Sequence, residues 1–180
     1  LAFFGDGASN EGAVHETANL AAMWSLPLIL LCENNGYCIT QRDTDAVKAP
    51  SIASRAAGYG LPGVQVDGTD PLAVQAAVAA AVTRARRGGG ASLIEARCER
   101  LTGHLIHDTQ GYRSPDELAA ARLRCPIALF EHRLLAAGMI SAEDCAALHA
   151  QIDAEVADAV AWARAQPEPA PSEAFEDLWA

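Results

Sequence analysis

The sequence lacks the features of several classes of protein. None of its apolar runs is long enough to span a bilayer, so we expect no membrane partner. Positive charge is scarce, because 13 lysines and arginines stand against 23 aspartates and glutamates and leave a formal net charge of -10. Without a basic stripe to offset this charge, we expect no nucleic-acid partner. With 180 residues, 51% of them hydrophobic, the chain has the size of a single domain with a substantial core.

Paired cysteines are also missing. The five cysteines are scattered and form no CxxC pair; they are Cys32, Cys38, Cys98, Cys125 and Cys145. Their odd number and the absence of a signal peptide predict reduced thiols and a cytoplasmic location. Cys32 lies within an apolar run, so we expect it to be an ordinary core residue.

Short apolar segments alternate with helical patterns through the first part of the chain. Strands are expected at residues 1–4, 28–32, 63–68 (with its turn) and 91–97. Helical spacing predicts helices at residues 13–24 and 72–87, and a short helical segment near 52–59. This alternation predicts an α/β fold, with a mostly parallel sheet and helices on both faces. The strand at 28–32 is apolar throughout, which indicates a central, parallel strand.

The first expected strand, Leu1-Ala-Phe-Phe4, stands at the start of the sequence. Its apolar character predicts a buried strand, and a domain rarely opens in the middle of its own sheet. We therefore expect the sheet to be incomplete at its N-terminal side and the chain to be part of a longer protein.

The second part of the chain has a different character. No periodic pattern occurs from residue 98 to 115, and a loop of this length is usually functional or disordered. Helices are expected at about 116–121, 126–137 and 142–165, followed by an extended tail at 167–173. Ser141 is the expected N-cap of the longest helix. We therefore expect an α/β portion at 1–115 and a helical C-terminal extension of the same domain at 116–180.

Polar residues follow the first two expected strands. Gly5-Asp6-Gly7 comes after one strand, and Asn34-Asn35 comes after the next. A right-handed strand–helix–strand crossover leaves both strand ends at one edge of the sheet, where open α/β sheets bind ligands. The glycines permit close approach, and the amides of Gly7 and Ala8 at a helix entrance would face an anion.

These residue types suit a magnesium–diphosphate site. Magnesium prefers oxygen ligands, of which the protein usually supplies one or two carboxylates. Asp6 offers a charged oxygen, Asn35 a neutral one, and a backbone carbonyl near Tyr37 a third. Taken singly, each motif is more often an ordinary turn. Their joint position at two strand ends favours the metal site.

The stretch from Gly5-Asp6-Gly7 to Asn34-Asn35 resembles the thiamine diphosphate motif, a GDG followed after a helix-sized gap by NN. The fuller text, GDGASNEGAVHETANLAAMWSLPLILLCENNGY, resembles the alpha subunit of the decarboxylating component of 2-oxo acid dehydrogenase complexes, in its pyruvate, branched-chain and acetoin types. The resemblance extends from Leu1 to about Leu135. It implies the thiamine diphosphate-binding fold and an oxidoreductase that uses thiamine diphosphate and Mg²⁺.

The resemblance also implies individual roles. Asp6, Asn35 and the Tyr37 carbonyl would hold the metal. Gly7, Ala8 and Asn35 would contact the cofactor, and residues 1–115 would form the cofactor-binding portion.

A loop motif of the same family, GHxxxD…YR, occurs as Gly103-His104-Leu-Ile-His-Asp108 and Tyr112-Arg113. By resemblance, His104 contacts the diphosphate and acts as a catalytic residue at the mouth of the active site. A histidine on a loop is suited to donating to a phosphate or relaying a proton. The alternative for His104 is an ordinary solvated loop residue, which is the reading we prefer for His107.

The resemblance implies partners as well. A beta subunit would supply the carboxylate that activates the cofactor, in an arrangement of two alpha and two beta subunits. A lipoyl acyltransferase core would receive the product of a 2-oxo acid or acetoin substrate. We therefore expect the isolated chain to be inactive. The alternatives are another thiamine diphosphate enzyme, of transketolase or synthase type, and an inactive fragment that serves only in assembly.

Overall fold

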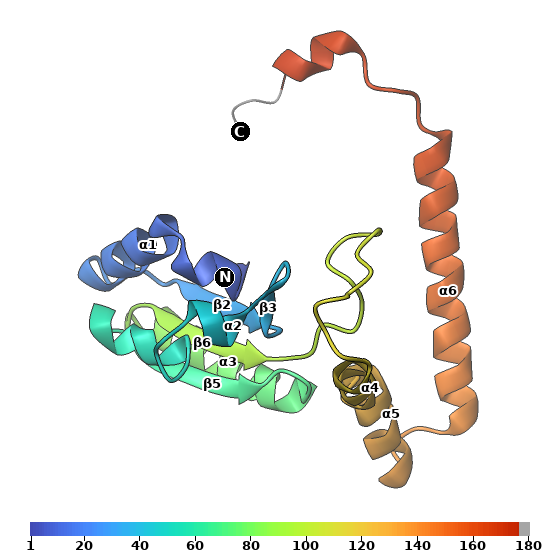
Figure 1. Cartoon of the computed structure of the whole chain (residues 1–180), viewed down its shortest axis with the longest axis horizontal. Coiled ribbons are helices and arrows are strands. Elements are labelled where there is room, and N and C mark those ends of the chain that lie inside the picture. The colour runs from blue at the N-terminus through green and yellow to red at the C-terminus, as the bar shows by residue number, and fades with distance from the viewer. Residues whose placement is uncertain (177–180) are drawn as a thin grey trace. The chain divides into compact units, whose positions relative to one another are not determined.

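The computed structural model describes residues 1–176. The described residues form two units, Leu1–His132 and the part of the chain from Arg133 onward (Figure 1). This division differs from the one predicted at residue 115, because helix α4 (Pro115–Leu123) and the start of helix α5 (Pro126–Ala136) belong to the first unit.

The first unit contains a four-stranded sheet in which each pair of neighbouring strands is parallel. In spatial order its strands are β1 (Ala2–Gly5), β2 (Ile29–Asn34), β6 (Ser92–Arg97) and β5 (Gly63–Asp67). The sequence prediction of an α/β fold with a mostly parallel sheet is confirmed. The apolar run of β2 lies between β1 and β6, as expected for a strand that is buried on both faces.

Helices cover both faces of this sheet (Figure 1). On one face, helix α1 (Gly12–Met23) and the 3-10 segment η2 (Ala53–Tyr59) pack through small side chains, among them Ala18, Ala21 and Ala56. On the other face, helix α3 (Pro71–Arg86) packs through Ala81 against Ile29, Leu31, Ile94 and Ala96. Alternating residues of β6 thus face opposite layers, with Leu93 in the first core and Ile94 in the second.

Strand β1 lies at the edge of the four-stranded sheet, and Phe3 is 61% exposed. The prediction that residues 1–4 form a buried strand is therefore wrong for this structure. Helix α3 covers the face of the sheet toward which Phe3 points, but its contacts are with β2, β5 and β6, so the side chain of Phe3 on the edge strand is left uncovered. Phe4, on the opposite side, packs against the core that includes α1.

Several short elements follow the ends of β1 and β2. The 3-10 turn η1 (Gly7–Asn10) follows β1, and a small antiparallel hairpin of β3 (Tyr37–Cys38) and β4 (Gln41–Arg42) follows β2. Helix α2 (Asp43–Ala46) completes this region. These elements surround the carboxyl edge of the sheet.

The second unit contains helix α6 (Ala142–Ala165). Ser141 caps it, and Asp144 completes a capping box with it, as the cap prediction required. The 3-10 turn η3 (Pro171–Phe175) follows, so the prediction of an extended tail at 167–173 is wrong over its last residues. Among residues 1–176, no helix has the length and apolar character needed to cross a membrane.

Candidate functional site

The ends of β1 and β2 bring two predicted site residues to one edge of the sheet. The two strands pair in parallel, with Gly5 opposite Glu33. Asp6 therefore follows the end of β1, and Asn35 follows the last residue of β2, Asn34. This is the edge at which open α/β sheets bind ligands.

Asp6 is buried without full hydrogen bonding. It is 3% exposed, and its Oδ2 has no hydrogen-bond partner within residues 1–176. Burial is the main cause that raises the pKa of Asp6 above its ordinary value; the charge of Asp43 adds to the rise, whereas Arg100 and Arg97 oppose it. A buried carboxylate oxygen without a partner is costly, and a bound cation would satisfy it.

The turn after β2 presents Asn35. The Asn35 Oδ1 accepts a hydrogen bond from the Tyr37 N–H (3.1 Å), and the Asn34 Oδ1 accepts one from the Gly36 N–H (3.0 Å). Gly36 has a φ of 83°, a conformation that favours glycine. A carbonyl oxygen has two lone pairs, so the Asn35 Oδ1 keeps one for a metal.

Gly7 packs against strand β3. A Cβ on Gly7 would lie 2.7 Å from the Cys38 Cβ and closer still to its Sγ, so only glycine fits there. This packing places the turn that contains Gly7 and Ala8 beside Tyr37 and Cys38. The predicted metal and cofactor residues of the first two strand ends therefore lie in one region.

The loop motif is organised around Asp108. Its carboxylate accepts hydrogen bonds from the His104 N–H (2.8 Å), the Gln110 N–H (2.8 Å) and the Tyr112 hydroxyl (2.7 Å). These bonds, with that of Tyr112 the largest cause, lower the pKa of Asp108 to about 2. The side chains of His104 and His107 are exposed. The motif thus forms a closed loop that leaves the His104 imidazole free to meet a ligand.

Arg100 was missed by the sequence reasoning. It is 9% exposed, it donates through Nη2 to the Tyr112 hydroxyl, and it lies over the Tyr37 and Tyr112 rings at 5.1 and 5.5 Å. Its Nε and Nη1 have no hydrogen-bond partner within the described part of the chain. The one signal in the sequence was an arginine shortly after a predicted strand, which does not distinguish it from other loop arginines.

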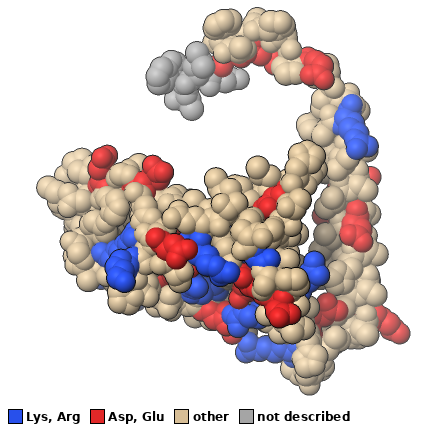
Figure 2. All heavy atoms as spheres, viewed as in Figure 1, with Lys and Arg blue, Asp and Glu red and all other residues tan. Residues whose placement is uncertain are grey.

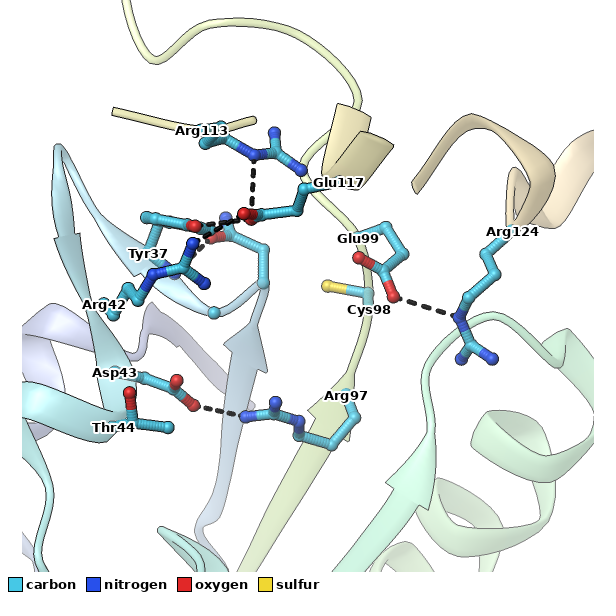
Figure 3. Close-up of a pocket in the computed structure, with 12 residues that line it drawn as sticks. Tyr37, Arg42, Asp43, Thr44, Arg97, Cys98, Glu99, Arg113, Glu117 and Arg124 are labelled. Atoms are coloured by element: carbon cyan, nitrogen blue, oxygen red, sulfur yellow. Dashed lines mark hydrogen bonds and ion pairs between the residues drawn. The ribbon is translucent and has the colours of Figure 1, made fainter. Parts of the chain in front are cut away.

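A polar cavity of about 360 Å³ opens beside Asn35 (Figure 3). Four arginines and three carboxylates line it. They form ion pairs between Arg97 and Asp43, Arg42 and Glu117 (2.5 Å), Arg113 and Glu117 (3.2 Å), and Arg124 and Glu99 (3.0 Å). Basic and acidic side chains also lie side by side on the face of the molecule in Figure 2. Burial raises the pKa of the Cys98 thiol in this cavity to about 11, which disfavours a thiolate nucleophile.

The fold and the site define a class of protein. A parallel sheet with helices on both faces, and polar residues gathered at the carboxyl ends of its strands, belongs to the open α/β proteins that bind ligands at this edge. A family model described as "Dehydrogenase E1 component" matches residues 1–172. The chain belongs to the dehydrogenase E1 component family.

Relatives of known function resemble almost the whole chain. It is 40% identical to the alpha subunit of acetoin:2,6-dichlorophenolindophenol oxidoreductase of Cupriavidus necator, over 99% of this chain and 54% of that protein. It is 41% identical to the 2-oxoisovalerate dehydrogenase subunit alpha of Bacillus subtilis, over 98% of this chain and 54% of that protein. It is 38% identical to the pyruvate dehydrogenase E1 component subunit alpha of Rhizobium meliloti, over 99% of this chain and 51% of that protein. The chain thus spans about half the length of these relatives.

Proposed function

We propose that this chain forms the metal- and diphosphate-binding part of the alpha subunit of a thiamine diphosphate-dependent dehydrogenase. The observation that carries the proposal is the buried Asp6 Oδ2, which lacks a partner within residues 1–176 at the ligand-binding edge of the sheet. A divalent cation satisfies such an oxygen. Membership of the dehydrogenase E1 component family supports thiamine diphosphate as the group bound together with that cation.

Three oxygen donors from this chain would hold Mg²⁺. They are the Asp6 carboxylate, the Asn35 Oδ1 and the backbone carbonyl of Tyr37. Oxygen donors suit Mg²⁺, which completes its coordination with phosphate oxygens and water. One carboxylate is enough because the diphosphate carries negative charge of its own.

The diphosphate would meet donors on the neighbouring segments. The N–H groups of Gly7 and Ala8 lie at the start of η1, where backbone donors favour an anion. The buried guanidinium of Arg100 adds N–H groups that have no hydrogen-bond partner among residues 1–176. His104, exposed on its loop, would donate to the diphosphate or relay a proton at the site mouth. The cofactor, when bound, supplies the carbanion chemistry, and the chain positions it.

The relatives' names support the substrate class and the assembly. Those names specify acetoin, pyruvate and 2-oxoisovalerate, and each relative is an alpha subunit. We therefore propose a 2-oxo acid or acetoin as substrate, a beta subunit as partner, and a lipoyl acyltransferase core as acceptor of the product. Cys32, Cys38, Cys98 and Cys125 are free thiols, which fits the cytoplasmic location that we propose.

Titration calorimetry tests this proposal. Thiamine diphosphate would be titrated, with and without Mg²⁺, into the full-length protein assembled with its beta subunit. We expect binding that requires Mg²⁺ and that is lost in Asp6→Asn. Asp158→Asn, the same chemical change on an exposed face of α6, is the matched control and should bind normally. Binding without Mg²⁺, or equal binding by the Asp6 variant, would refute the metal assignment.

A further inference from the structure

Glu95 is a buried carboxylate that the proposed site does not use. It lies on β6, is 1% exposed, and faces the α1 side of the sheet. Its Oε1 accepts a hydrogen bond from the Asn34 Nδ2 (2.8 Å), and its Oε2 accepts one from the Ala53 N–H (2.9 Å). Burying a carboxylate is expensive. The hydrogen bonds from Asn34 and Ala53 must therefore offset the cost of burying this charge.

The hydrogen bonds of Asn34 fix the orientation of its side-chain amide. Its Nδ2 donates to two carboxylates, those of Glu95 and Asp43 (3.1 Å), and its Oδ1 accepts from the Gly36 N–H (3.0 Å). A reversed amide would direct its oxygen at two carboxylates, which are acceptors, and its NH₂ group at the Gly36 N–H, which is a donor, so only one orientation satisfies all three bonds. Asn34 itself is 1% exposed.

The same amide controls the backbone of the turn that presents Asn35. Because the Gly36 N–H is bound to the Asn34 side chain, the backbone on both sides of Asn35 is held. The Asn35 side chain is then oriented by the Tyr37 N–H (3.1 Å). Hydrogen bonds from Glu95 through Asn34 to Gly36, and the covalent backbone of the turn from there, therefore connect the third strand of the sheet with Asn35 and Tyr37, two of the three proposed metal ligands.

We propose that Glu95 is a positioning residue that sets the metal-binding turn through Asn34, an inference that rests on the proposed function. Glu95 touches neither metal nor cofactor. It acts by holding the Asn34 amide, which in turn fixes the direction of the Asn35 Oδ1 and the path of the chain at Tyr37. Residues that orient metal ligands in this way commonly influence metal affinity by about 10- to 100-fold.

Glu95→Gln removes the charge and retains the shape. An amide at this position has one oxygen for two donors, so its NH₂ group must face either the Asn34 Nδ2 or the Ala53 N–H. We expect the apparent Mg²⁺ affinity, measured by calorimetry in the presence of thiamine diphosphate, to fall by at least about tenfold. Excess Mg²⁺ should restore thiamine diphosphate binding, because the ligand atoms themselves are intact.

Ile94→Val is the matched control. Ile94 is adjacent on β6 but faces the opposite core, so the change lowers stability without touching the turn. The full-length protein with its beta subunit would be used for all variants, and unfolding temperatures would be recorded without Mg²⁺. Loss of Mg²⁺ affinity in Glu95→Gln alone supports the positioning role. Equal affinity in both variants, or an equal loss in both, overturns it.

Two further arms keep the outcome clear. If Glu95→Gln does not fold, Asn34→Ser is measured instead. This variant removes the amide that joins Glu95 to Gly36 and should show the same selective loss of Mg²⁺ affinity. Unchanged Mg²⁺ affinity in that variant overturns the inference. If the wild-type protein shows no Mg²⁺-dependent binding of thiamine diphosphate, the proposed function itself fails. If wild type and Glu95→Gln both bind normally, only the positioning role fails.

Discussion

Gly7 packs so closely against Cys38 that no Cβ fits between the turn after β1 and strand β3. This relationship joins two segments that are separated by a helix and a strand in the sequence. It brings the proposed diphosphate amides next to the proposed metal carbonyl. The site therefore depends on the absence of a side chain as much as on the donors that are present.

Gly7→Ala should damage both stability and binding. The added methyl group overlaps the Cys38 side chain, and overpacking of this kind costs about 1–3 kcal/mol in the free energy of unfolding. Urea unfolding would measure the loss, and the double variant Gly7→Ala/Cys38→Ala should recover part of it. Gly5→Ala is the control, because a Cβ at Gly5 meets nothing within 4 Å. An equal effect of both alanine substitutions would contradict the packing argument.

Asp6→Asn should stabilise the metal-free protein while it removes metal binding. The pKa of Asp6 is raised, mainly by burial, so the folded state favours the neutral form and its stability increases as the pH falls through that raised pKa. Above that raised pKa the buried carboxylate is charged, and replacing it should add roughly 1 kcal/mol to the free energy of unfolding. Thermal unfolding without Mg²⁺ is the measurement. A lower unfolding temperature for the variant would show that the carboxylate stabilises the fold instead.

Mg²⁺ binding should also be linked to protons. Mg²⁺ binds the ionised Asp6 carboxylate, so its affinity should fall as the pH is lowered toward the raised pKa of that group. Calorimetry in buffers with different ionisation enthalpies, repeated as the pH is lowered toward that raised pKa, would detect the released protons. In Asp6→Asn this proton release should be absent. A Mg²⁺ affinity that does not vary with pH would argue against Asp6 as the ligand.

Tyr112→Phe should loosen the loop that contains His104. The hydroxyl donates to Asp108 and accepts from Arg100, and it is the largest cause of the low pKa of Asp108, about 2. Because the pKa of Asp108 is depressed, its hydrogen bonds stabilise the loop fully at pH values above the ordinary pKa of 3.8. This stabilisation is lost as the pH falls toward about 2. Carbon-detected NMR titration should find a higher Asp108 pKa in the variant. An unchanged pKa would assign the depression to the backbone N–H donors alone.

The main elements of the fold could be predicted from local patterns. The apolar run of β2 identified a central strand, and the residues after it and after β1 identified the edge of the sheet. The exposed side of β1 could not be predicted, because exposure of Phe3 depends on which strands α3 covers. The apolar residues of a segment predict that it forms a strand, but they do not predict which helix packs against that strand.

Part of the candidate site lay beyond sequence reasoning for a similar reason. Asp6 and Asn35 follow strands directly, so their shared edge could be inferred from topology. The bond between Glu95 and Asn34 joins residues that are 61 positions apart, and an isolated glutamate in an apolar strand gives no sign of its partner. The same holds for Arg100: that two of its buried nitrogens lack partners in the described part of the chain becomes apparent only from the structure.

The central claim is that Asp6, Asn35 and the Tyr37 carbonyl hold a divalent cation together with a diphosphate. Crystals of the full-length protein with its beta subunit, grown with thiamine diphosphate and Mn²⁺ in place of Mg²⁺, would test it through the anomalous signal of the metal. We predict one anomalous peak within coordination distance of the Asp6 carboxylate, the Asn35 Oδ1 and the Tyr37 carbonyl oxygen. A cofactor bound with its metal on other residues, or a peak remote from Asp6, would contradict the account.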